Sequence, residues 1–175
     1  MTRWAVPEDA PELADVHVTT WQVAYRGILD ESFLLGLDRG AREAWWRRFI
    51  AEGARVHVVG EERVVGFCHA TGSADEGWGE VFSIYVHPEW WGSGLGHRLL
   101  AAGEDSLRRL GFDRALLWVL ERNVRARSFY EGHGWVRGRP IRVEDIGGVQ
   151  VNEIRYEKDL TGPDRPLPGR SETSP

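Results

Sequence analysis

The sequence has one cysteine, one lysine and no long apolar run among its 175 residues. A single thiol cannot close an internal disulfide, so we expect Cys68 to be an ordinary packed side chain in a cytoplasmic protein. No stretch reaches the ~18 apolar residues of a membrane span, and the N-terminus has no apolar signal core, which predicts a soluble chain. Lys158 is the only lysine, a bias toward arginine that we attribute to codon usage.

Clusters of basic residues and of metal ligands are missing as well. The formal net charge is -5, which argues against nucleic acid or an anionic membrane as the main partner. The histidines show no metal-ligand spacing, so we expect no metal site. The length predicts one domain, which we place at residues 1–160. Residues 161–175 form a tail with too little apolar content to order itself.

The pattern of apolar residues predicts a mixed α/β domain. Helices are expected at residues 7–25, 33–37, 45–50, 94–110 and 123–133. Strands are expected at residues 3–6, 55–59, 63–71, 78–86, 115–120, 135–143 and 149–157. The last two flank Gly147-Gly148 and predict a hairpin. The apolar face of the helix at 94–110 is expected to consist of Leu99, Leu100, Leu107 and Leu110.

The most informative segment leads from an apolar strand through a glycine-rich loop into a helix. Gly92, Gly94 and Gly96 occupy alternate positions in this loop. Glycines let the backbone turn tightly and bring amide N–H groups close to a ligand. Together with the partial positive charge of a helix N-terminus, they predict an anion site suited to a pyrophosphate. A glycine-rich turn without a ligand is the alternative.

Two other phosphate-binding motifs do not fit this loop. A P-loop needs Gly-x-x-x-x-Gly-Lys followed by Ser or Thr, and the loop contains no lysine. A dinucleotide-binding fold needs Gly-x-Gly-x-x-Gly after its first strand. Here the spacing is Gly-x-Gly-x-Gly and several predicted strands precede it, so this reading is poor too.

The segment resembles the cofactor motif of the GNAT acetyltransferases, in which Arg or Gln-x-x-Gly-x-Gly or Ala follows a strand ending in Val-x-Pro. Val86-x-Pro88 and Gly94-x-Gly96 match, whereas Trp91 stands where Arg or Gln is usual. The resemblance covers about residues 2–160 and includes segments 3–10, 21–27 and 123–135. It implies the GNAT fold: a mixed, mostly antiparallel sheet with a splayed parallel strand pair and helices on both faces.

The resemblance also implies an activity, the direct transfer of an acetyl group from acetyl-CoA to a primary amine of a small molecule or peptide in a ternary complex. A non-catalytic acyl-CoA-binding module and a larger acyl donor are the alternatives. The acceptor, and whether the protein is a homodimer, stay open. The residues expected to bind the pantetheine arm are Ile84, Tyr85, Val86 and Asn123, and those expected at the pyrophosphate are Trp91, Gly92, Ser93, Gly94, Leu95, Gly96 and His97.

Two residues carry the chemistry that the resemblance implies. Tyr130 occupies the position of a general acid, since a phenol with a pKa near 10 can return a proton to a thiolate whose parent thiol has a pKa of about 8.5. The alternative is a packed tyrosine. Glu80 begins the strand on which the family often carries its general base, but it shares a face with Ile84 only if no bulge intervenes. The alternative for Glu80 is a solvated strand residue.

Overall fold

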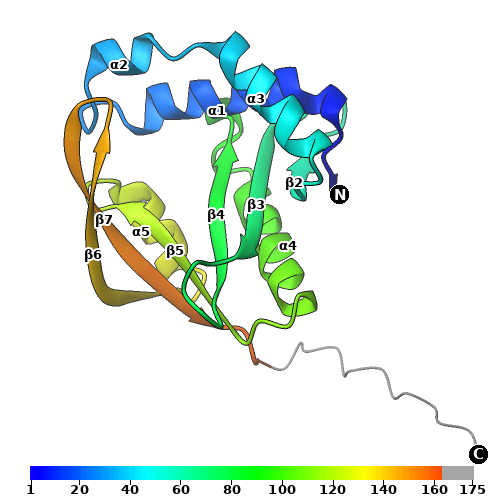
Figure 1. Cartoon of the computed structure of the whole chain (residues 1–175), viewed down its shortest axis with the longest axis vertical. Coiled ribbons are helices and arrows are strands. Elements are labelled where there is room, and N and C mark those ends of the chain that lie inside the picture. Colours follow the sequence, from blue (N-terminus) through cyan, green and yellow to red (C-terminus); the bar gives the residue numbers. More distant parts are fainter. Residues whose placement is uncertain (163–175) are drawn as a thin grey trace, which may run out of the picture.

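The computed structural model describes residues 1–162, and its strands form one sheet (Figure 1). The strands are β1 (Thr2–Trp4), β2 (Val56–Val59), β3 (Gly66–Gly72), β4 (Gly79–Val86), β5 (Arg114–Leu120), β6 (Val136–Ile146) and β7 (Val149–Asp159). Their order is β1-β2-β3-β4-β5-β7-β6, and every neighbouring pair is antiparallel except β4 and β5. The predicted fold class is therefore confirmed. The predicted disordered tail lies, from residue 163 onward, outside the described residues.

Helices cover both faces of the sheet. They are α1 (Ala10–Ala24), α2 (Glu31–Leu35), α3 (Arg39–Ala51), α4 (Leu95–Arg109) and α5 (Val124–Glu131), with short 3-10 turns η1 (Pro7–Asp9) and η2 (Pro88–Trp90). Side chains of α1 and α3 share one buried cluster with β2 and β3, whereas those of α4 and α5 share another cluster with β4, β5 and β7. Within residues 1–162, no helix combines the length and apolar character needed to cross a membrane.

The helix α4 packs closely on the sheet through a face that the sequence largely predicts. Leu99, Leu100 and Leu107 are buried, but Leu110 is 63% exposed, so its predicted place on this face is wrong. The reason is that the helix ends at Arg109 and leaves Leu110 as its C-terminal cap. A Cβ added at Gly103 would lie 2.8 Å from the Cys68 sulfur, so glycine allows α4 to approach β3 this closely.

The strands β4 and β5 separate soon after they begin. Their parallel pairing is limited to Gly79–Glu80 with Ala115–Leu116. Beyond this point β4 stays paired with β3 and β5 stays paired with β7. The glycine loop follows the carboxyl end of β4 and Asn123 follows that of β5, so both predicted binding segments lie where the two strands have diverged. This is the splayed parallel pair that was expected.

A bulge in β4 decides which way its side chains face. Residues His69 and Ala70 of β3 pair with Ser83 and Val81, so Phe82 is an extra residue of β4. Val81 lies in the cluster under α4, and Ile84 and Val86 contact the same cluster, which the bulge makes possible. Because side chains alternate along a strand, Glu80 lies on the opposite face from Val81 and hence from Ile84.

Candidate active site

The glycine loop adopts a conformation that other residues rarely take. Gly92 and Gly94 have φ angles of 83° and 82°, in the left-handed region. A Cβ added at either position would meet nothing within 4 Å, so the space beside the loop is open. The first turn of α4 lies next to α5, because a Cβ added at Gly96 would lie only 3.4 Å from the Phe129 ring.

The N-terminus of α4 is uncapped, unlike that of its neighbours. Gly94 provides no side-chain cap, and the first turn contains no acidic residue. By contrast, Asp38 caps α3 by accepting a hydrogen bond from the Ala41 amide at 3.0 Å, and Asn123 caps α5 by accepting one from the Ala126 amide at 3.1 Å. The first amides of a helix have no partner within the helix. The bare start of α4 therefore leaves donors and a positive dipole end available to an anion.

Trp91 is anchored rather than loosely placed at the position where the family usually has Arg or Gln. Its indole nitrogen donates to the Val86 carbonyl at 2.7 Å, and the buried Thr20 hydroxyl donates to the same oxygen at 3.2 Å. The Arg125 guanidinium lies 3.9 Å above the Trp91 ring. A positive charge in the first turn of a helix interacts unfavourably with the helix dipole, so Arg125 does not stabilise α5 by its position. Sequence analysis missed both Thr20 and Arg125, and only the position of Arg125 gave a signal.

The remaining loop residues have local roles. The Ser93 hydroxyl donates to the Trp90 carbonyl at 2.6 Å and braces the turn. Leu95 contacts the buried cluster beneath α4. The ring of His97 lies 4.9 Å from that of His133, at the end of α5. These contacts tie the loop to the core and to the neighbouring helix.

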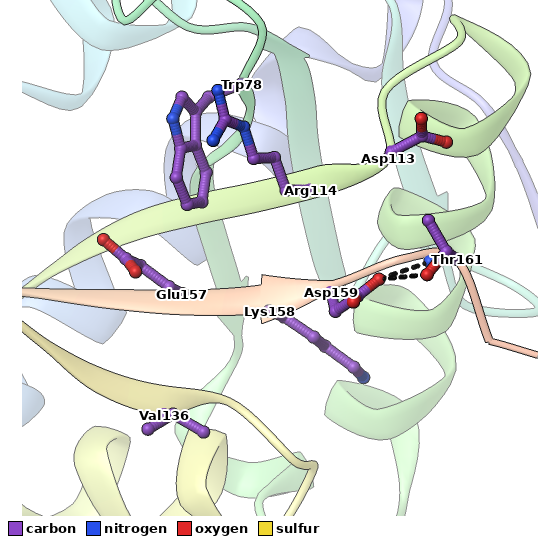
Figure 2. Close-up of a pocket in the computed structure, with 8 residues that line it drawn as sticks. All are labelled: Trp78, Asp113, Arg114, Val136, Glu157, Lys158, Asp159 and Thr161. Carbon is purple, nitrogen blue, oxygen red and sulfur yellow. Dashed lines mark hydrogen bonds between the residues drawn. The ribbon is translucent and has the colours of Figure 1, made fainter.

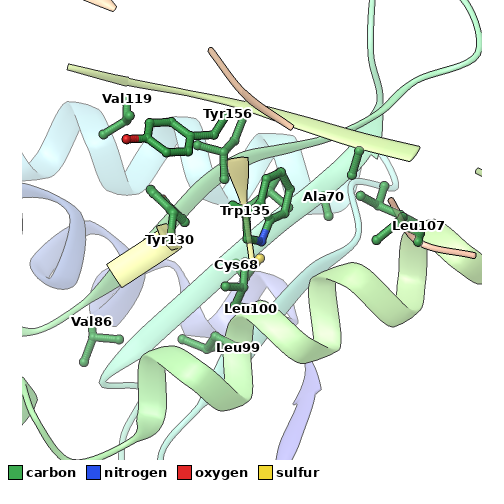
Figure 3. Close-up of a cluster of buried hydrophobic side chains, with 14 of the residues drawn as sticks. Cys68, Ala70, Val86, Leu99, Leu100, Leu107, Val119, Tyr130, Trp135 and Tyr156 are labelled. Carbon is green, nitrogen blue, oxygen red and sulfur yellow. The ribbon is translucent and has the colours of Figure 1, made fainter. Parts of the chain in front are cut away.

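Tyr130 lies in the core beneath the diverging strands, with only 8% of the residue exposed (Figure 3). Its ring is 6.3 Å from both the Trp135 and the Tyr156 ring. Burial raises the pKa of Tyr130, and the nearby hydroxyl of Tyr85 and thiol of Cys68 raise this pKa further. The phenol is therefore protonated at neutral pH, as a proton donor must be.

Two further tyrosines lie close to this one. Burial raises the pKa of Tyr25 and of Tyr85, and the two hydroxyls are near enough to influence each other. Tyr130 and Glu153 also raise the pKa of Tyr25, and Glu153 raises that of Tyr85. Tyr25 follows α1, Tyr85 belongs to β4 and Glu153 to β7, so the group is assembled from distant segments. Sequence analysis placed Tyr25 at the end of the first predicted helix and assigned no role to Glu153.

Glu80 lies apart from this group. It is half-buried opposite Leu116, where β4 and β5 are still paired. Its carboxylate accepts a hydrogen bond from the Ser73 hydroxyl at 3.0 Å. It lies on the face opposite Val81 and Ile84, so the condition on which the sequence placed it beside Ile84 is not met.

A surface hollow of about 440 Å³ lies at the other end of β5 (Figure 2). It is lined by Trp78, Asp113, Arg114, Val136, Glu157, Lys158, Asp159 and Thr161. None of the residues predicted to bind the co-substrate or to take part in catalysis is among them. In residues 1–162 there is also no group of three or more His, Cys, Asp or Glu side chains arranged to hold a metal ion.

Comparison with known proteins identifies the family. The sequence model of the acetyltransferase (GNAT) family matches residues 19–135. The chain belongs to the GNAT acetyltransferase family. A GNAT relative, the N-acetyltransferase YuaI of Bacillus subtilis, is 32% identical over 155 residues, which cover 87% of this chain and 88% of YuaI. The mycothiol acetyltransferase of Thermobispora bispora is 38% identical over 58% of this chain, but the match spans only 35% of that protein.

Solved GNAT structures share the fold. The N-acetyltransferase of Staphylococcus aureus Mu50 superposes with a TM-score of 0.72 at 17% identity, covering 91% of this chain and 98% of the other. An acetyltransferase of Salmonella typhimurium, solved with acetyl-CoA, gives a TM-score of 0.69 at 22% identity, with 93% and 94% covered. A Thermoplasma acidophilum N-acetyltransferase, solved with coenzyme A, gives 0.66 at 20% identity, with 91% and 98% covered.

Proposed function

We propose that this protein transfers an acetyl group from acetyl-CoA to a primary amine, directly and in a ternary complex. The observation that carries the proposal is the bare N-terminus of α4, which opens beside the gap between β4 and β5. Two structural neighbours were solved with coenzyme A or acetyl-CoA, which supports the same co-substrate. The acceptor is a small-molecule or peptide amine, and the partial match to mycothiol acetyltransferases does not narrow it further.

The residues present fit the co-substrate at both of its polar parts. The loop from Gly92 to His97 would hold the pyrophosphate through its amides, and Arg125 above Trp91 would add positive charge beside it. The inner edge of β4 at Ile84–Val86, which has no pairing with β5, would bind the amide groups of the pantetheine arm. The cap at the start of α5 uses the side-chain oxygen of Asn123, so its NH2 group would face the arm.

Tyr130 would supply the proton that the leaving thiolate needs. Acetyl-CoA provides an activated thioester; the new bond joins the amine nitrogen to the acetyl carbon as the carbon–sulfur bond breaks. The nitrogen loses one proton and the sulfur gains one. A phenol is a weaker acid than this thiol, so Tyr130 would deliver its proton as the carbon–sulfur bond breaks. It would then be reprotonated from the base that accepted the amine proton.

The base that accepts the amine proton has two candidates. Glu80 was expected from the resemblance and would act through water, because it lies on the face away from Ile84. Glu153 is the carboxylate close to Tyr25 and Tyr85, and it is held by the Arg142 guanidinium at 2.6 Å. Comparing Glu80→Gln with Glu153→Gln separates them. The variant that removes the base should lose turnover by about 10²-fold, whereas the other should keep the turnover of the wild type.

The experiment that tests the proposal is thiol release from acetyl-CoA over a panel of amines, with Tyr130→Phe beside the wild type. We expect amine-dependent release by the wild type and a loss of turnover of about 10²-fold in Tyr130→Phe, with coenzyme A affinity little changed. The loss should shrink with an acyl donor whose leaving thiol is more acidic. Calorimetry with coenzyme A provides the control for binding.

Each outcome has a distinct meaning. Coenzyme A binding without release over the whole panel would point to a non-catalytic acyl-CoA-binding module. Faster release from a longer acyl-CoA would keep the transferase and change its donor. Turnover by Tyr130→Phe within about twofold of wild type, in a step limited by chemistry, would remove Tyr130 from its role and leave the proton to water.

A further inference from the structure

A charged carboxylate is buried in the middle of α4. Glu104 lies between the buried Leu100 and Leu107, and its side chain is only 7% exposed. Burial and the nearby Glu104 charge raise the pKa of the Cys68 thiol to about 12. An ionised group in such surroundings needs strong partners, because removing it from water is costly.

The only lysine of the chain provides the main partner. The Lys158 ammonium donates to both Glu104 oxygens at 2.8 Å and to the His133 carbonyl at 2.9 Å. An ammonium has three donors, and all three are used. The Trp135 indole donates to the same carboxylate at 2.9 Å, and Arg108 lies 3.6 Å from it. In Figure 2 the Lys158 side chain leaves β7 on the side away from Trp78.

This network reaches Tyr130 through two residues, His133 and Trp135. The Tyr130 carbonyl accepts hydrogen bonds from the His133 amide at 2.9 Å and from the Trp135 amide at 3.1 Å. Trp135 therefore bonds to Tyr130 through its backbone and to Glu104 through its side chain. The ion pair joins α4, β7 and the turn that ends α5, three segments distant in the sequence. Figure 3 shows Trp135 between Tyr130 and the side chains of α4.

We propose that Lys158 and Glu104 are positioning residues, which hold the end of α5 against α4 and so fix the Tyr130 hydroxyl relative to the glycine loop. The inference rests on the proposed role of Tyr130 as the proton donor. A displacement of about 1 Å at a reacting group can cost about 10²-fold in rate. The network fixes the residue for which such a displacement matters.

Stability alone is a weak reason for this arrangement. A buried ion pair contributes little net stability compared with a well-packed apolar pair. What it provides is direction, because three bonds from one ammonium set the relative positions of Glu104 and His133. The planar guanidinium of an arginine cannot place three donors in this way. The chain has one lysine among its 22 lysine and arginine residues, and that lysine is here.

The test uses variants that separate position from stability. Lys158→Met and Glu104→Gln should each lower kcat about tenfold or more, with the KM for acetyl-CoA within about twofold. Each leaves a partly or fully buried charged group without its main partner, so the melting temperature falls. The double variant removes both partners, so it should recover melting temperature but not kcat. Asp105→Asn is the matched control, because Asp105 is the next residue of α4 and its side chain, which pairs with Arg108, is 52% exposed. Its kcat should equal that of the wild type.

Adding Tyr130→Phe closes the argument. If Lys158 acts through Tyr130, Lys158→Met should slow the Tyr130→Phe enzyme by less than twofold. Equal factors in both backgrounds, or an unchanged kcat in Lys158→Met, would overturn the positioning role and leave Tyr130 as the acid.

A second readout does not need activity. The chain has four tyrosines, so labelled tyrosine NMR gives few resonances, each assignable with a phenylalanine variant. Lys158→Met should shift the Tyr130 resonance and leave those of Tyr25 and Tyr85 in place, whereas Asp105→Asn should shift none. If the wild type releases no thiol with any amine, the proposed function fails. The NMR spectrum still tests whether Lys158 fixes the position of Tyr130. An unmoved Tyr130 resonance would overturn the positioning role.

Discussion

On the α4 face of the sheet, buried polar side chains form hydrogen bonds and an ion pair with one another. On the α1 face, aromatic rings surround a histidine that has no hydrogen-bond partner among the described residues. Glu104, Lys158 and the Trp135 indole form the network under α4. Under α1 and α3, neither ring nitrogen of His17 nor the indole nitrogen of Trp46 has a hydrogen-bond partner within residues 1–162. Directional bonds fix the face that carries the predicted co-substrate site. Ring packing, which tolerates adjustment, fills the other.

The largest expected effect follows from making the start of α4 resemble that of α3. Gly94→Asp adds a capping carboxylate and a negative charge where the amides are bare, and it places a side chain at a left-handed φ. Coenzyme A affinity measured by calorimetry should fall by about 10²-fold or more, since both the donors and the dipole end are blocked. Asp38→Ala is the control. It removes the cap of α3, costs about 1 kcal/mol of stability and should leave affinity unchanged. Unchanged affinity for coenzyme A in a folded Gly94→Asp protein would disprove the predicted pyrophosphate site at the start of α4.

The unpartnered histidine predicts an acid sensitivity specific to the α1 face. Burial, helped by the positive charge of Arg42, lowers the pKa of His17 to about 3. The unfolded chain binds this proton near pH 6.5 and the folded chain does not, so stability is lost as pH falls from 6.5 toward 3. By pH 5 this amounts to about 2 kcal/mol. Between pH 7 and pH 5, the free energy of unfolding should therefore fall by about 2 kcal/mol less in His17→Phe than in the wild type. The free energy of unfolding can be measured by urea titration at each pH. The same pH dependence in wild type and His17→Phe would contradict the lowered pKa of His17.

A pair of tryptophan variants compares the two faces directly. Trp46 and Trp135 are each 2% exposed, but only the Trp135 indole donates a hydrogen bond, to the Glu104 carboxylate. Trp→Phe removes a similar volume at both sites, so the difference in cost reflects that bond. Trp135→Phe should cost about 2 kcal/mol more than Trp46→Phe in urea unfolding, the usual contribution of a hydrogen bond to a charged group. Equal costs would show that the two faces are held in the same way.

Much of the fold was predictable because it rests on local patterns. The near-continuous apolar run at residues 115–120 predicted a strand, and its residues Leu116 and Leu117 are buried on opposite faces of the sheet. The glycine loop was visible from its spacing alone. The position of the bulge at Phe82 was not, because alternation before and after it looks regular in the sequence, and this position decides whether Glu80 and Ile84 share a face.

Contacts between distant residues were beyond reach. Glu104 and Lys158 are 54 positions apart, and neither stands in a motif, so no pattern could pair them. Tyr25 was expected at the end of a helix, yet nothing in the sequence indicated that it would lie near Tyr85 or Glu153. Most of the predicted co-substrate residues were accessible to sequence analysis because they lie within residues 84–97, whereas these groups come from separate elements.

The scarcity of lysine affects how far this protein would be acylated non-enzymatically by a reactive thioester. Acyl donors such as acetyl-CoA slowly modify free lysine amines without any enzyme, and each such event removes a positive charge. Here the one lysine side chain is 21% exposed and its three hydrogens are all bonded, while the other strongly basic side chains of the sequence are arginines. Guanidinium groups stay protonated and do not attack thioesters at neutral pH. The surface charge should therefore resist spontaneous acylation, and amine-reactive dyes should find almost no side chain to label.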